Sequence, residues 1–161
     1  MTPAVKGAIL GVVHVAMVLS LGAKLLIDRS TMPRVWARTA PYDPDLPIRG
    51  RYLSLRLLAD AKGFAPGVVY HVAKLSVENG RLVARPSEDS GDIGATVGKD
   101  ESIATLTEPD AYFIPEHAVD PSRRPSGEEL WVEVTVPPKG PPRPIRLGVK
   151  RDGVLTPLDL N

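Results

Sequence analysis

Apolar and polar residues alternate along several short segments that follow the first thirty residues of the chain. The clearest segment runs from Tyr52 to Leu57, where leucines occupy every second position and polar or aromatic side chains lie between them. A period of two is typical of a β-strand with one buried face. This segment therefore predicts a strand whose leucines point toward a core.

Four other segments show the same alternation, at residues 34–39, 69–85, 130–136 and 145–155. Two of them contain Asn-Gly or Asp-Gly dipeptides, which favour tight hairpin turns because both positions tolerate positive φ. With 17 prolines and 14 glycines separating them, we expect seven or eight short strands. The pattern predicts a mainly β fold, either a small antiparallel β-sandwich or a partly open barrel.

The N-terminal region has a different pattern, because Gly7 to Ile27 is apolar except for His14 and Lys24. About twenty residues form about 30 Å of helix, enough to cross a bilayer. Lys24 lies near the end of the run, where its side chain reaches the headgroups. We interpret His14 as a polar side chain that faces a helical partner or a backbone carbonyl, with a proton-relay or metal-binding role as the alternative.

A cleaved signal peptide is the competing interpretation of this apolar run. Small residues near Ala23 give a poor cleavage pattern, since Leu21 stands where a small residue is expected. We therefore expect residues 1–29 to be a single uncleaved transmembrane anchor and residues 30–161 to form a soluble β-rich domain.

The orientation of the anchor is less clearly encoded. One basic residue precedes the apolar run and four lie at or just after its end, which by the positive-inside tendency keeps the domain cytoplasmic. Long C-terminal domains translocate largely regardless of charge, however, and a short leading tail resembles an export signal. We expect the domain to lie outside the cytoplasm.

Composition narrows the functional classes. A net charge of +1 gives no electrostatic reason to expect nucleic-acid binding. The absence of cysteine excludes disulfides, cysteine metal sites and thiol nucleophiles. Residues 86–101 are acidic and rich in glycine, but their spacing matches no calcium loop, so we predict a solvated loop and no metal or cofactor. We predict a second loop at residues 120–127, with its arginine pair as surface charge.

A catalytic constellation is not evident. His71 shares a predicted strand face with Leu75 and Val77, which indicates a partly buried, satisfied ring. Glu116 and His117 are adjacent, so in a strand they point to opposite faces. No serine lies in a G-x-S-x-G motif, although a Ser/Lys dyad such as Ser54 or Ser102 with Lys74 needs only two residues. The sequence favours a non-catalytic protein and leaves an enzyme open.

The strand at Tyr52 is preceded by a loop containing Pro41, Pro44 and Pro47. Proline fixes φ and restricts the residue before it, so this loop has few conformations to lose on folding. Gly50 then provides a positive φ or a close backbone approach. The loop is either a well-made turn before a strand or a rigid display of charged residues to a partner.

These residues resemble the GDYXXLXY family of bacterial membrane-anchored proteins, whose motif reads D-P-x-x-x-x-R-G-D-Y-x-x-L-x-Y with a later Y-F-x-P-E. The matching positions are Asp43, Pro44, Arg49, Gly50, Tyr52, Leu55, Tyr112, Phe113, Pro115 and Glu116. Arg51 replaces the family's aspartate and Leu57 its last tyrosine. The resemblance implies one N-terminal anchor, a β-domain without assigned activity, and a place beside polytopic membrane proteins in the bacterial inner membrane.

Two hypotheses follow. In the first, the chain is a non-catalytic accessory or interaction protein whose partners are the lipid bilayer and a polytopic membrane protein, with a periplasmic domain. In the second, it is a membrane-tethered hydrolase or ligand-binding module with a cleft between residues 49–52 and 112–117. For both, the candidate binding residues are the ten matching positions together with Arg51.

Overall fold

The computed structural model describes residues 2–40, 52–67, 70–98, 102–115, 117–118, 120–122 and 124–160. The chain divides into two units, residues 1–32 and residues 33–161. The first unit contains one helix and the second contains every strand of the described chain. We describe each unit by itself.

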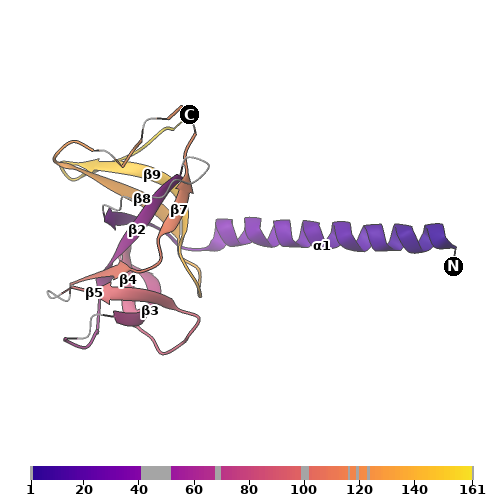
Figure 1. Cartoon of the computed structure of the whole chain (residues 1–161), viewed down its shortest axis with the longest axis horizontal. Coiled ribbons are helices and arrows are strands. Elements are labelled where there is room, and N and C mark those ends of the chain that lie inside the picture. The colour runs from indigo at the N-terminus through magenta and orange to yellow at the C-terminus, as the bar shows by residue number, and fades with distance from the viewer. Residues whose placement is uncertain are drawn as a thin grey trace. The chain divides into compact units, whose positions relative to one another are not determined.

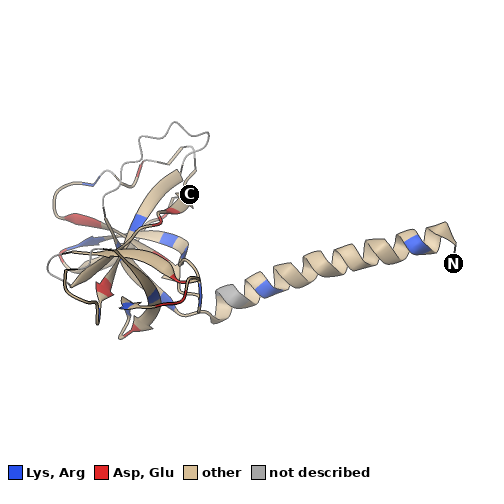
Figure 2. Ribbon diagram, turned by 60° about the horizontal axis from the view of Figure 1, so that its bottom comes forward, with Lys and Arg blue, Asp and Glu red and all other residues tan. Residues whose placement is uncertain are grey.

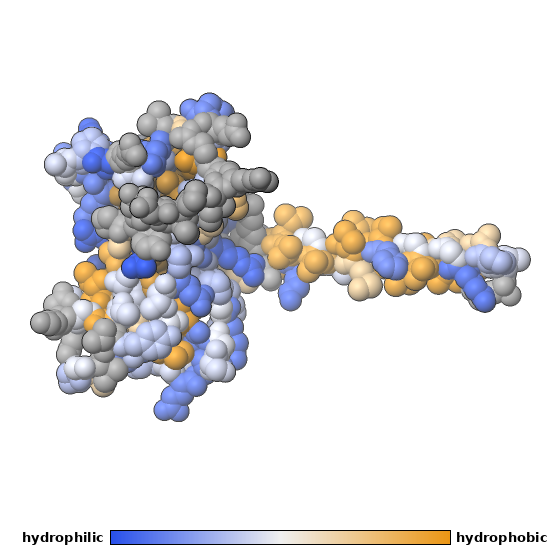
Figure 3. Space-filling view, viewed as in Figure 1, coloured by the Kyte–Doolittle hydropathy of each residue, from blue (hydrophilic) through white to orange (hydrophobic). Residues whose placement is uncertain are grey.

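Helix α1 (Pro3–Thr31) forms the first unit. Its segment Pro3–Ile27 is long and apolar enough to cross a membrane, a test that an N-terminal signal sequence also passes. Its surface is largely apolar and carries few charges (Figures 2 and 3). His14 donates from Nδ1 to the carbonyl oxygen of Leu10 at 2.8 Å, which agrees with the predicted backbone partner. Pro33 follows the helix and cannot continue its hydrogen bonding.

The second unit is mainly β, as predicted (Figure 1). Its strands, in chain order, are β1 (Arg34–Ala40), β2 (Tyr52–Ala61), β3 (Tyr70–Glu78), β4 (Arg81–Pro86), β5 (Ile93–Val97), β6 (Ile103–Leu106), β7 (Asp110–Phe113), β8 (Glu128–Thr135), β9 (Arg143–Arg151) and β10 (Val154–Pro157).

Strand β2 organises the sheet because both of its edges are paired. Near its end, Asp60 pairs with Val83 of β4 in parallel and with Ile103 of β6 in antiparallel orientation. Since β4, β3, β5 and β6 are paired in that order, the β2–β6 pairing closes a five-stranded barrel. The barrel is therefore closed rather than partly open, and it contains one parallel pair.

Four of the remaining strands extend the sheet from β2 in the order β1, β8, β9 and β10, and β7 pairs with β2 apart from this series. Strand β1 pairs with β2 from Arg38 to Ala40 and with β8 from Arg34 to Arg38. Beyond Leu58, the same edge of β2 pairs with β4. The sheet thus forks beside Ala59, with β1 on one branch and β4 on the other.

The core lies inside the barrel and beneath the extension. The alternating leucines of β2 are buried as predicted, with Leu57 fully enclosed. Val132 and Val134 of β8 and Leu147 of β9 have no exposed surface, so one face of the extension is apolar. Burying these side chains is the main stabilising contribution to such a fold.

Both predicted hairpin turns are confirmed. Asn79 and Gly80 have φ values of 50° and 73° between β3 and β4, and Asp152 and Gly153 have values of 50° and 82° between β9 and β10. Positive φ at both central residues is typical of the type I′ turn, whose twist matches that of the strands.

The predicted solvated loop at residues 86–101 is wrong in part, because it contains β5. Ile93, Ala95 and Val97 point into the core, and Gly94 and Thr96 lie between them. Three small or medium apolar residues in an acidic, glycine-rich stretch give a weak alternation. Pairing with β3 and β6 supplies the burial that the local composition does not indicate.

Candidate functional site

The described parts of the two motif blocks lie side by side, because β2 and β7 are antiparallel neighbours. Tyr52 pairs directly with Phe113, and Leu53 pairs with Tyr112. The rings of Tyr52 and Phe113 have centroids 6.2 Å apart at an interplanar angle of 53°. Phe113 is 76% exposed. The pair forms a small aromatic surface, which we call the aromatic edge.

The other motif residues divide into two groups. Tyr112 and Leu55 face the core, with Leu55 only 2% exposed, so the leucine is a packing residue. Pro115 is half-buried just after β7. Six candidate residues lie outside the described part of the chain: Asp43, Pro44, Arg49, Gly50, Arg51 and Glu116.

Asp110 begins β7 opposite Leu55. Burial raises the pKa of this carboxyl to about 7, and the nearby charge of Glu108 adds to the effect. A carboxyl that titrates near neutral pH is a recognised feature of functional sites, although structural burial also produces it. Sequence analysis did not identify Asp110.

The histidines of the second unit do not form a site. His71 is half-buried, as predicted, and its ring centroid lies 4.7 Å from that of Phe64 in an edge-to-face arrangement. His117 is exposed in a turn. Among the described residues, no three metal-ligating side chains come together.

A cavity of about 520 Å³ lies at the fork of the sheet, between β1 and β8 on one side and β4 on the other. Trp36 and Trp131, the two tryptophans of the chain, both line it. Five charged side chains also line it: Arg38, Asp60, Arg81, Glu129 and Lys150. We call this the tryptophan cavity.

Glu129 organises one wall of the tryptophan cavity. Its Oε1 forms an ion pair with Arg38 at 2.9 Å, and its Oε2 accepts a hydrogen bond from the indole N–H of Trp131 at 3.1 Å. Lys150 places its Nζ 4.7 Å from the centroid of the same indole ring. These contacts fix the indole on the outer face of β8 with a cation against it.

Trp36 is positioned by strand β9. A Cβ added to Gly148 would lie 2.8 Å from Cζ3 of Trp36, so the indole ring occupies space that only glycine leaves open. Arg146 lies over this ring, 5.4 Å from its centroid, and donates to Glu133 at 2.6 Å. The ring is thus held between the backbone of β9 and a paired guanidinium.

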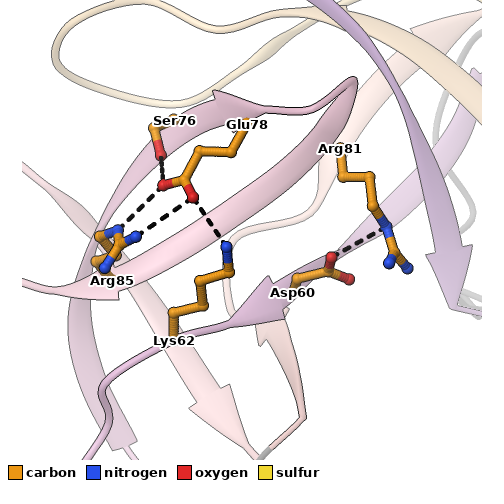
Figure 4. A network of polar contacts seen from close by, with 6 residues as sticks. All are labelled: Asp60, Lys62, Ser76, Glu78, Arg81 and Arg85. Atoms are coloured by element: carbon orange, nitrogen blue, oxygen red, sulfur yellow. Dashed lines mark hydrogen bonds and ion pairs between the residues drawn. The ribbon is translucent and has the colours of Figure 1, made fainter.

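The opposite wall carries the ion pair between Arg81 and Asp60, at 3.0 Å. A separate network lies nearby on the barrel (Figure 4). There Glu78 accepts from Arg85 and Lys62, and these hydrogen bonds lower the pKa of Glu78 to about 2. Exposed pairs of this kind contribute little to stability.

A smaller cavity, of about 270 Å³, is lined by residues of β1, β2, β8 and the loop before β8, with Ser54 and Arg124 among them. Arg124 donates to the carbonyl of Pro121 at 2.8 Å and pairs with Glu128 at 3.5 Å, and its side chain is only 24% exposed. The prediction of surface charge is therefore wrong for Arg124, which ties its loop to β8.

The tryptophan cavity was not predicted, although one signal was present in the sequence. Trp131 alternates with the buried valines of β8 and therefore lies on the non-core face. A large aromatic on the polar face of a strand often marks a binding surface. The partner wall could not be located, because nothing local indicates that β1 pairs with β8.

Comparisons of the chain with protein-family models, with curated proteins and with solved structures gave no match.

Proposed function

We propose that this chain is a membrane-anchored, non-catalytic interaction protein whose aromatic edge contacts a polytopic membrane protein. In this proposal α1 is an uncleaved anchor in the bacterial inner membrane and the β-domain is periplasmic. We also propose that the chain is related to the GDYXXLXY family, on the basis of the ten matching motif positions.

The observation that carries the proposal is the exposure of Phe113 beside Tyr52. Covering an exposed aromatic ring with a partner removes apolar surface from water, and aromatic residues are enriched at the centres of interfaces. Both rings come from the blocks that the family motif marks.

The backbone at the same place supports a contact surface. Within the described residues, β7 pairs with β2 along one edge and with no strand along the other. An unpaired strand edge accepts an extended segment of a partner through main-chain hydrogen bonds. The aromatic edge therefore combines a side-chain anchor with an open backbone.

The helix supports a location within a membrane complex. Gly7 and Gly11 lie one turn apart, and a Cβ added at either would meet nothing within 4 Å. Small residues at this spacing allow a second transmembrane helix to approach closely. A polytopic protein supplies such helices.

Site-specific photocrosslinking in native membranes tests this proposal. A photoreactive phenylalanine at position 113 should crosslink to one integral membrane protein, and Phe113→Ala should weaken recovery of that protein in detergent. The matched control is the same probe at Val154, which is 67% exposed on β10. Equal crosslinking from both positions, or no adduct at position 113, would contradict the proposed partner surface.

The alternative is a hydrolase or ligand-binding module with a cleft between the two motif blocks. The cross-strand pairing of Tyr52 with Phe113 gives it less support, because neighbouring strands of one sheet do not form opposite walls of a cleft. The observation that favours this alternative is the pKa of about 7 for the carboxyl of Asp110. Under our proposal, Asp110→Asn leaves partner recovery unchanged.

A further inference from the structure

The tryptophan cavity combines features that the proposed partner surface does not use. Its volume of about 520 Å³ lies within the range of about 300 to 1,000 Å³ that small-molecule sites occupy. Trp36 and Trp131 are both only partly buried and both line the cavity. Strand β9 and Arg146 already contact the ring of Trp36, so the indole surface for an occupant with a flat apolar face comes from Trp131.

The charged side chains form two pairs that place a donor beside an acceptor. Arg38 with Glu129 lies on one wall, and Arg81 with Asp60 lies on the other. A guanidinium only donates hydrogen bonds and an ionised carboxylate only accepts them. Adjacent hydroxyl groups on a sugar ring can accept from the first and donate to the second, so each pair suits a vicinal diol.

Lys150 is the fifth charged residue that lines the cavity, and it belongs to neither of the two ion pairs. Among the described residues no carboxylate lies within ion-pair distance of its Nζ, which rests against Trp131. It can neutralise one negative charge. Asp60 and Glu129 would repel an occupant with several charges, which disfavours a polyphosphate or a strongly acidic peptide.

We propose that the tryptophan cavity binds an acidic saccharide, namely a hexopyranose unit that carries one carboxylate. The C–H face of the ring packs on an indole, neighbouring hydroxyls bond to the two ion pairs, and the carboxylate pairs with Lys150. This inference is independent of the membrane partner proposed above, because the aromatic edge contributes no residue to the cavity.

Intrinsic fluorescence is a direct test, since both tryptophans of the chain line this cavity. The full-length protein is titrated with a glucuronic-acid oligosaccharide and with the neutral glucose oligosaccharide of equal length. A sugar-free polyoxyethylene detergent is required, because a maltoside headgroup would compete. We expect a saturable change in tryptophan fluorescence with the acidic ligand. The neutral ligand should bind about tenfold more weakly, because it lacks one charged contact.

Two lysine variants separate this site from general surface charge. Lys150→Gln should reduce the affinity for the acidic ligand to that for the neutral one and leave the neutral affinity unchanged. The control is Lys139→Gln, which removes a lysine paired with Asp89 elsewhere on the domain and should change neither affinity. Trp131→Phe, which keeps an apolar ring, should lower the affinity for both ligands.

Saturation-transfer NMR on the same samples detects binding that leaves fluorescence unchanged. Absence of binding by both methods would overturn the proposal. Equal affinity for acidic and neutral ligands, or equal behaviour of the two lysine variants, would overturn the assignment of the carboxylate to Lys150. Acid-selective binding that depends on Lys150 and Trp131 would support it.

Discussion

The closed barrel and the strands that extend from it use their two faces differently. Alanines fill much of the barrel interior, with Ala73, Ala84, Ala95 and Ala104 fully buried. The extension buries one face in the same core, but its other face carries both tryptophans and several charged side chains. Aromatic and charged side chains are therefore concentrated where the sheet leaves the barrel.

The difference follows from strand number. A closed barrel becomes wider as strands are added, and about eight strands are needed before the interior can hold even one small ligand. With five strands the interior has room only for small side chains and a few leucines. A protein built on this barrel must place any ligand or partner on an outer surface, and the fork beside Ala59 creates such a surface.

The largest effect should come from opening the barrel interior. Leu57→Ala should reduce the free energy of unfolding by about 3 kcal/mol, because it removes buried methyl groups and leaves a cavity in a rigid core. Urea denaturation of the full chain in detergent measures this. The exposed control Val154→Ala should change stability by less than about 0.5 kcal/mol. A cost for Leu57→Ala close to that of the control would contradict the division between the two regions.

A smaller effect is expected from crowding the tryptophan cavity. Gly148→Ala should cost about 1 to 2 kcal/mol, because the new methyl group forces the indole of Trp36 to move. The tryptophan emission spectrum should shift at the same time. In the double variant with Trp36→Phe, part of the cost should disappear, since the shorter ring removes the clash. Strictly additive free energies would show that the two positions are not coupled.

The smallest effect concerns Asp110 beside the aromatic edge. Its pKa of about 7 in the folded protein exceeds the ordinary value of 3.8, so the folded state binds the proton more tightly. The free energy of unfolding should therefore fall as pH rises from about 4 to about 7. Asp110→Asn should remove this slope and stabilise the protein by about 1 kcal/mol at pH 8, the full shift being reduced by partial exposure.

Denaturation of both proteins at pH 4 and pH 8 measures this difference. At pH 4 the variant and the unaltered protein should have similar stability, because the carboxyl is then largely neutral in the folded state. A variant that is less stable at pH 8 would indicate that the ionised carboxylate makes a favourable contact.

Local pattern was sufficient to predict the alternating leucines of β2 and both hairpin turns. The turns at Asn79 and Asp152 depend only on adjacent residues, so the sequence contains the whole signal. The apolar run of α1 is equally local. Strand β5 was missed because glycine and aspartate dominate its surroundings.

Features that depend on distant pairing were not predictable from one sequence. Closure of the barrel requires β2 to pair with β6, and the tryptophan cavity requires Trp36 and Trp131 to come together through β1 and β8. Alternation specifies which side chains point inward in each strand, but it does not specify which strand is the neighbour. The aromatic edge was predicted in part, since both motif blocks were identified from the sequence but their pairing was not.

The pairing of β1 with β8 also constrains the order of events during synthesis. Strand β1 emerges from the ribosome directly after α1, yet its partner begins only at Glu128. At about 5 to 20 residues per second, the chain between them takes about 5 to 20 seconds to make. Throughout that interval the edge of β1 that joins β8 lacks its partner strand, and an unpaired strand edge is prone to non-native pairing.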